Sequence, residues 1–223
     1  MSSLIPLLIA LAVLALIAFI VLIVRAGRRK ARQRTEALER VCYEMGFTFE
    51  AVGDLDMLKT LGDLPLYRRG HSIRARNMMS GRVGDDEVKV LDFRYTTGGG
   101  EHQQTVVQTV AVFPRGARGL PDLQLAPENV FHRIGQVFGY QDIDFESDPE
   151  FSKRYLVRGP DETAIRAALH ADALSFFAEH EGWTVEVRSE TVGTYRAGKR
   201  CAAEGIPTFL DEAYTILRHL RRA

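Results

Sequence analysis

An uncharged stretch at the N-terminus decides where this chain can reside. Residues 4–24 carry no charged side chain, and the first charge is Arg25. A helix of that length is about 31 Å long at about 1.5 Å per residue, which matches the hydrocarbon core of a bilayer. Pro6 falls in the first turn, where its missing N–H has no intrahelical partner to lose. The stretch 4–24 is therefore predicted to be a single transmembrane helix.

Basic side chains follow this stretch directly. A cleaved signal peptide carries its cations before the apolar segment, so the pattern indicates an uncleaved anchor. The positive-inside rule places such cations in the cytoplasm, with the N-terminus outside, where they can contact anionic lipid headgroups. The expected headgroup contacts are Arg25, Arg28, Arg29, Lys30, Arg32 and Arg34.

The charge balance of the remaining chain excludes some partners. The sequence has 29 basic and 29 acidic residues, and residues 25–40 hold seven of the basic and two of the acidic ones. Beyond residue 40 acidic residues therefore outnumber basic ones, so nucleic acid is not expected as a partner.

The chain has two cysteines and no C-x-x-C motif. It is thus not a disulfide scaffold, and free thiols suit a reducing cytoplasm.

The soluble part is predicted to be α+β. Residues 25–46 read as a basic stem helix that ends at Gly46, and 47–49 as a short strand. Three β-rich runs, 73–79, 88–97 and 105–113, predict an antiparallel β-meander. Apolar residues occur on both parities of the second run, which suggests a bulge or a strand covered on both faces.

Helical and strand patterns continue to the C-terminus. Residues 123–125 and 154–157 read as short strands, and 183–196 as a second β-hairpin. Helices are predicted over 54–62, 127–139, 161–181 with a break near His170, and 207–222. The cytoplasmic domain would comprise residues 47–223, with lobes 47–140 and 141–223 as an alternative. One domain is favoured because no Pro-, Gly- or Ser-rich linker divides the chain.

The sequence contains none of the common catalytic motifs. Its six histidines form no pair at metal-ligand spacing, and it has no G-x-S-x-G, Walker or Rossmann pattern. The acidic run over 142–150 lacks the spacing of a calcium loop, and the glycines 98–100 join two strands, as in a hairpin tip. We therefore expect no catalytic residue, no metal and no cofactor, and a non-enzymatic protein is favoured over an enzyme.

An arginine-rich sheet face is the strongest candidate site. Arg74 and Arg76 point to one face of their strand, and Asp92 and Arg94 share a face on the next strand. Arginine binds phosphate or carboxylate through paired donors, so the four residues could form an anion site in which Asp92 orients the arginines. The favoured interpretation, however, is a solvated face whose arginines form ion pairs with Asp92 or with the acidic residues 85–87.

The chain resembles a group of bacterial membrane-anchored proteins of unknown function. The similarity rests on an F-x-Y-T-T-G-x-G hairpin at 93–100, followed by the strand within 103–112, and on a D-F-E element at 144–146 with E-F-x-x-R-Y at 150–155. It covers roughly residues 64–200 and departs at Arg94, where the group has an aromatic or apolar residue. The resemblance implies a bacterial, membrane-tethered α+β domain, and hence the inner membrane. It implies no catalytic residue.

Two functional hypotheses follow. The leading one is a non-enzymatic interaction or adaptor module that holds an unidentified protein partner at the inner leaflet. The alternative is a domain that binds an anion or a lipid headgroup through the arginine-rich face, or an enzyme that acts there on membrane material. A third idea, self-association through the anchor, has little support because residues 4–24 contain no G-x-x-x-G.

Overall fold

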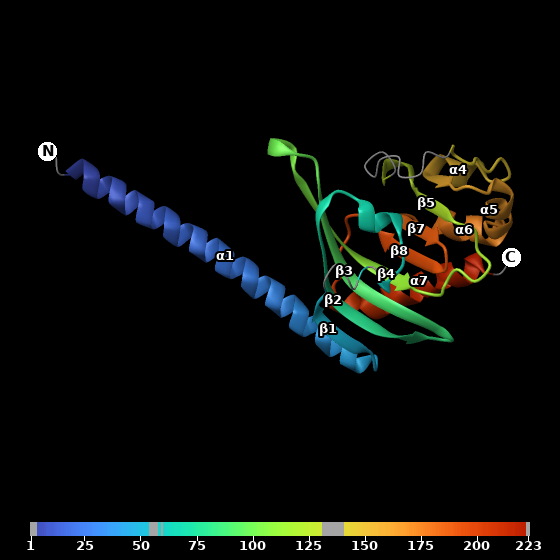
Figure 1. Ribbon diagram of the computed structural model, residues 1–223, viewed down its shortest axis with the longest axis horizontal. Helices are drawn as coiled ribbons and strands as arrows, with labels where there is room; N and C mark the ends of the chain where they lie inside the picture. The colour runs from blue at the N-terminus through green and yellow to red at the C-terminus, as the bar shows by residue number, and fades with distance from the viewer. Residues whose placement is uncertain (1–3, 54–57, 59, 131–140, 222–223) are drawn as a thin grey trace.

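The computed structural model describes residues 4–53, 58, 60–130 and 141–221, and it confirms the predicted α+β class (Figure 1). The helices are α1 (Leu4–Glu44), α4 (Pro149–Arg154), α5 (Glu162–Ala168), α6 (Ala171–Glu179) and α7 (Ile206–Leu220). The strands are β1 (Thr48–Val52), β2 (His71–Val83), β3 (Asp86–Thr97), β4 (Gln104–Phe113), β5 (Leu123–Pro127), β6 (Tyr155–Arg158), β7 (Trp183–Arg188) and β8 (Thr191–Arg196). Short 3₁₀ turns are η1 (Pro65–Arg68), η2 (Gly100–His102) and η3 (Ala203–Gly205).

Helix α1 is one unbroken rod of 41 residues that contains both the apolar stretch and the basic stem. Its N-terminal half extends away from the rest of the protein (Figure 1). The large apolar side chains described from Leu8 to Val24 are all at least 44% exposed. A continuous apolar surface of this kind is unfavourable in water and is typical of a segment that lies in the hydrocarbon core of a bilayer. Helix α1 is thus long and apolar enough to cross a bilayer once, and the protein is membrane-anchored.

The eight strands form one sheet in which every neighbouring pair is antiparallel. The strand order is β1-β2-β3-β4-β8-β7-β5-β6, which contains the expected meander. The expected hairpin β7–β8 lies in the middle of the sheet, between β4 and β5. One sheet therefore runs through both halves of the chain.

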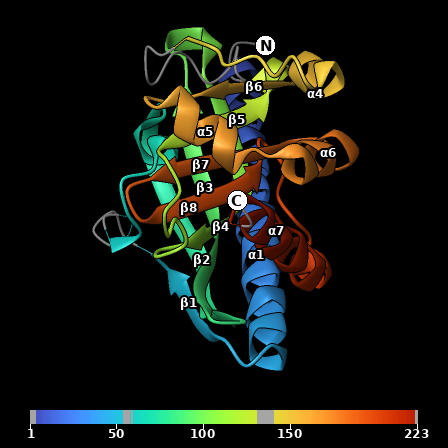
Figure 2. The same ribbon diagram turned by 90° about the vertical axis from the view of Figure 1, so that its right-hand side faces the viewer.

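The sheet separates two apolar layers. Helices α1, α6 and α7 contribute to the larger one, and α1 and α7 lie near each other beside the strands (Figure 2). The smaller layer includes Leu61, Leu64 and Leu66 from the segment around η1. On β3, Val90 belongs to the larger layer and Phe93 to the smaller one. The mixed parity of this strand thus reflects burial on both faces.

Several sequence expectations need correction or lie outside the described residues. The bulge suggested for the strand over 88–97 is not found on β3. The two register shifts of the β2–β3 pair each add one residue to β2, so the bulges lie on β2. Helix α4 was not predicted from the sequence; it begins at Pro149 because the Asp148 side chain accepts a hydrogen bond from the backbone N–H of Phe151. The predicted helices 54–62 and 127–139 fall largely on residues 54–57, 59 and 131–140, outside the described part.

A charged contact joins the C-terminal end of α7 to the start of β3. The Arg221 guanidinium donates two hydrogen bonds, of 2.8 and 2.9 Å, to the Asp86 carboxylate. These bonds hold the pKa of Asp86 below its ordinary value, against the opposing effect of burial. Arg221 also donates to the Gly116 carbonyl, so the last turn of the chain is tied to the sheet.

Candidate functional site

The stem half of α1 docks on the sheet through one apolar stripe and one ion pair. Leu38 and Cys42 are fully buried against the larger apolar layer. One turn earlier, Arg34 donates from Nε and Nη2 to the two carboxylate oxygens of Asp92 on β3, at 2.7 Å each. Both side chains are close to nine-tenths buried, so this bidentate pair is shielded from solvent. It fixes the position of α1 relative to β3.

A pocket of about 210 Å³ opens beside this ion pair, between α1 and strands β2 and β3. The structure brings together in its lining all four residues of the expected anion site, Arg74, Arg76, Asp92 and Arg94. The remaining lining residues are Ala31, Arg34, Thr35, Asn77, Val107 and Arg200. We call this the arginine pocket.

The expected role of Asp92 was wrong. Its carboxylate does not orient the sheet arginines, because it accepts hydrogen bonds from Arg34, from Asn77 Nδ2 at 2.9 Å and from Thr109 Oγ1 at 3.4 Å. Asn77 Oδ1 in turn accepts a hydrogen bond of 2.9 Å from Thr35 Oγ1 of α1. Asp92 is therefore the centre of the joint between stem and sheet.

Four of the five arginines of the pocket are exposed and have no acidic partner among the described residues. Within the described part of the chain, no carboxylate forms an ion pair with Arg74, Arg76, Arg94 or Arg200. Two of the acidic residues suggested for that role have other partners, since Asp86 pairs with Arg221 and Glu87 with Arg115. The pocket thus has five arginines and one carboxylate in its lining.

The basic cluster behind the apolar stretch divides into two groups. Residues 25–32 are exposed along α1, where nothing in the domain covers them. Arg34 was expected with them as a headgroup contact, and this part was wrong because its guanidinium is held by Asp92. Arg32 forms an exposed ion pair of 2.8 Å with Glu36 one turn later.

Four polar residues of the pocket, Arg34, Thr35, Asn77 and Arg200, were not predicted from the sequence to line it. Arg34 carried a usable signal, since it lies four residues before Leu38 and so extends the docking stripe of α1 by one turn. Asn77 lines the pocket because of the bulge in β2, and Arg200 lines it because the fold brings residue 200 close to α1. No local pattern marks these two positions.

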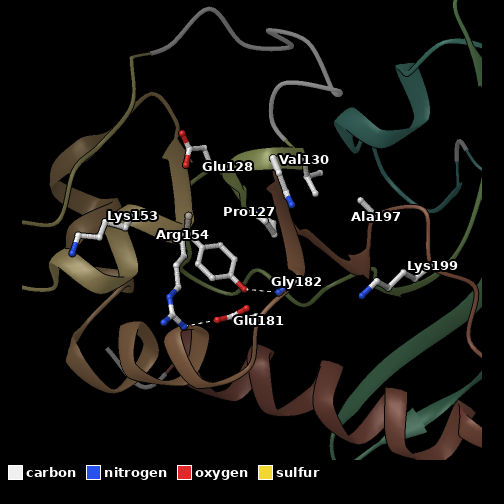
Figure 3. Close-up of a pocket in the computed structure, with 11 residues that line it drawn as sticks. Pro127, Glu128, Val130, Lys153, Arg154, Glu181, Gly182, Ala197 and Lys199 are labelled. Atoms are coloured by element: carbon white, nitrogen blue, oxygen red, sulfur yellow. Dashed lines mark hydrogen bonds and ion pairs between the residues drawn. The ribbon is translucent and has the colours of Figure 1, made fainter.

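A larger cavity, of about 520 Å³, lies between β5, α4 and the end of β8 (Figure 3). Three of the five charged side chains in its lining, Lys153, Arg154 and Glu181, form ion pairs. Arg154 forms an ion pair with Glu181 across the cavity wall and donates to the Ala178 carbonyl at 3.0 Å, and Lys153 pairs with Glu150. The cavity therefore offers less unsatisfied charge than the arginine pocket, despite its size.

The two free cysteines are not activated thiols. Burial raises the pKa of Cys42 and also that of Cys201. A reactive cysteine needs a lowered pKa, so neither adds nucleophilic chemistry to the site.

These features define a class, a membrane-anchored α+β protein whose anchor helix continues into the domain. No protein-family model matches the chain, and no curated protein matches it significantly. Among solved structures, the crystal structure of the mycobacterial trehalose monomycolate transport factor A, TtfA, is similar, with a TM-score of 0.58 at 14% sequence identity. The alignment covers 86% of this chain and 96% of that one. At this identity the likeness shows a shared fold.

Proposed function

We propose that this protein is a single-pass accessory factor of the bacterial plasma membrane, whose domain holds a protein partner at the cytoplasmic leaflet without catalysing a reaction itself. The observation that carries the proposal is that α1 is one continuous helix. Its apolar N-terminal half is exposed, and its C-terminal half packs on the sheet through Leu38 and Cys42. From Val24 to Arg34 this helix rises about 15 Å. The Arg34–Asp92 pair therefore holds the sheet at a set distance from the bilayer.

The cytoplasmic orientation is supported by charge. All the cations next to the apolar stretch follow it, and residues 25–32 are exposed and available to anionic headgroups. The bacterial setting is supported by the sequence resemblance and by the mycobacterial source of the similar structure. That protein is described as a transport factor, which supports an accessory role for this fold beside a membrane process.

Co-purification tests the partner role. We expect the full-length protein, extracted from native membranes in mild detergent and captured by a C-terminal tag, to retain a membrane protein in near-stoichiometric amount. The matched control is the tagged segment 1–46, which keeps the anchor, the stem and Gly46 but lacks the sheet. The partner should be absent from the control and should recover the full-length protein in the reciprocal capture. Identical proteins on both baits, or none on either, would contradict the proposal.

A further inference from the structure

The arginine pocket holds more positive charge than the protein neutralises. Its lining has five arginines and one aspartate, and that aspartate is already paired with Arg34. Arg74, Arg76, Arg94 and Arg200 have no ion-pair partner among the residues that the structure describes. We propose that the arginine pocket is a binding site for a phosphate group. This site goes beyond the partner role, and its test has a separate readout.

The pairing of β2 with β3 places two like charges opposite each other. Arg74 is the direct cross-strand partner of Arg94. Like charges in directly opposed positions destabilise a sheet, and the next pair along, Arg76 with Asp92, does not relieve this one because Asp92 binds Arg34. A bound anion would remove the repulsion, so the arrangement is suited to the occupied state.

The backbone of β2 is distorted on both sides of the two arginines. Register shifts lie between His71 and Arg74 and between Arg76 and Met79, and the left-handed residues Ser72 (φ 54°) and Asn77 (φ 52°) fall within them. Bulges redirect side chains and are common beside binding sites, and strained residues concentrate at functional positions. The second bulge lets the consecutive residues 76 and 77 both line the pocket, which a regular strand would not allow.

Phosphate fits the pocket better than a carboxylate does. A phosphate monoester carries about −1.5 to −2 charges at pH 7 and three strong acceptor oxygens, which several arginine forks can share. A carboxylate brings a single charge and would leave most of the excess unneutralised. The volume of about 210 Å³ is below the ~300–1,000 Å³ typical of drug-sized ligands. The pocket therefore suits a headgroup-sized anion.

The phosphate can come from the membrane or from solution. Ala31, the pocket residue nearest to the apolar stretch, lies seven residues after Val24, or about 10 Å along α1. The headgroup layer extends about 5–8 Å beyond the hydrocarbon core. A phosphate on a projecting lipid headgroup and a soluble phosphate compound both have access at this depth, and the experiment distinguishes them.

The test uses the full-length protein in phosphatidylcholine nanodiscs and follows thermal unfolding by the fluorescence of Trp183, the single tryptophan, which is fully buried in β7. One arm titrates pyrophosphate, and the other adds phosphatidic acid to the nanodisc. The test variant is Arg74→Gln with Arg76→Gln. The matched control is Arg82→Gln with Arg218→Gln, which removes the same charge from exposed positions outside both the pocket and the basic stem.

We expect at least one probe to raise the unfolding temperature of the wild type. The test variant should bind that probe roughly tenfold more weakly, and the control should change by less than about twofold, because exposed charges away from the site are screened. Without a probe, the test variant should be as stable as the wild type or more so, since Arg94 loses its opposed charge. Arg94→Gln repeats the test from the neighbouring strand.

The outcomes separate the source and decide the proposal. A response to pyrophosphate identifies a soluble ligand, and a response to phosphatidic acid alone identifies a lipid headgroup. The proposal is overturned if neither probe binds, if the test variant and Arg94→Gln bind as the wild type does, or if the control loses binding equally. Partner capture by the test variant would still report on the proposed accessory role.

Discussion

Replacing Glu186 by glutamine is expected to lower the free energy of unfolding by about 3–5 kcal/mol, because it leaves a buried arginine without a counter-charge. Glu186 is fully buried on β7 and forms an ion pair with Arg69, which is 4% exposed. The carboxylate also accepts hydrogen bonds from the Leu66 backbone N–H at 2.8 Å and from the Tyr195 hydroxyl at 2.7 Å. Glutamine keeps one acceptor oxygen, which can serve Tyr195 in place of Oε1, but puts an NH₂ group where Oε2 accepts from Leu66, so that hydrogen bond is lost together with the charge.

Urea-induced unfolding of the full-length protein in detergent, followed by Trp183 fluorescence, measures this loss. The control is Asp63→Ala, which breaks the exposed Arg68–Asp63 pair in the same segment and should cost less than about 1 kcal/mol. Combining Glu186→Gln with Arg69→Leu removes both charges and should recover more than half of the loss. A single variant as stable as Asp63→Ala, or a double variant no more stable than the single one, would contradict this account of the core.

Placing two arginines in the apolar half of α1 should release the protein from the membrane. Leu14 and Ile17 lie in the middle of residues 4–24 and are both more than 50% exposed. On an insertion scale, leucine or isoleucine at the centre of a span contributes about −0.3 to −0.6 kcal/mol and arginine about +2.5 to +3.5. The change Leu14→Arg with Ile17→Arg therefore opposes insertion by about 6–8 kcal/mol.

Alkaline carbonate extraction of membranes measures this effect. The wild type should stay in the pellet, as should the matched variant Leu14→Ala with Ile17→Ala, which remains apolar. The arginine variant should appear in the supernatant or be degraded. A cooperative unfolding transition of Trp183 in the released protein excludes loss of the fold as the cause. Retention of the arginine variant in the pellet at the wild-type level would show that α1 does not anchor the protein by insertion.

The meander, the β7–β8 hairpin and the last helix could be predicted because each depends on local pattern. Alternating apolar residues and turn residues mark β2 to β4, and the apolar spacing of α7 is helical throughout. The insertion of β7 and β8 between β4 and β5 could not be predicted, since it pairs strands far apart in sequence. Helix α1 continues through Gly27 although glycine is a weak helix former, because the residues on both sides of it favour the helix.

The site was predictable to the extent that it lies on adjacent strands. Arg74, Arg76 and Arg94 could be grouped because alternation and a short turn place them on one sheet face. The contact of Arg34 with Asp92 joins residues 58 positions apart, and only the docking of α1 brings them together. It also changed the role of Asp92 from a partner of the sheet arginines to the anchor point of the stem.

The orientation of the domain is the claim on which the proposed function depends, and reporter fusions at the C-terminus of the full chain test it most directly. Green fluorescent protein fluoresces after export only poorly, whereas alkaline phosphatase is active only outside the cytoplasm. The basic cluster that begins at Arg25 predicts that, in intact cells, the green fluorescent protein fusion is fluorescent and the alkaline phosphatase fusion is inactive. An active phosphatase fusion with a dark fluorescent protein would place the sheet and the arginine pocket outside the cytoplasm and contradict the proposed function.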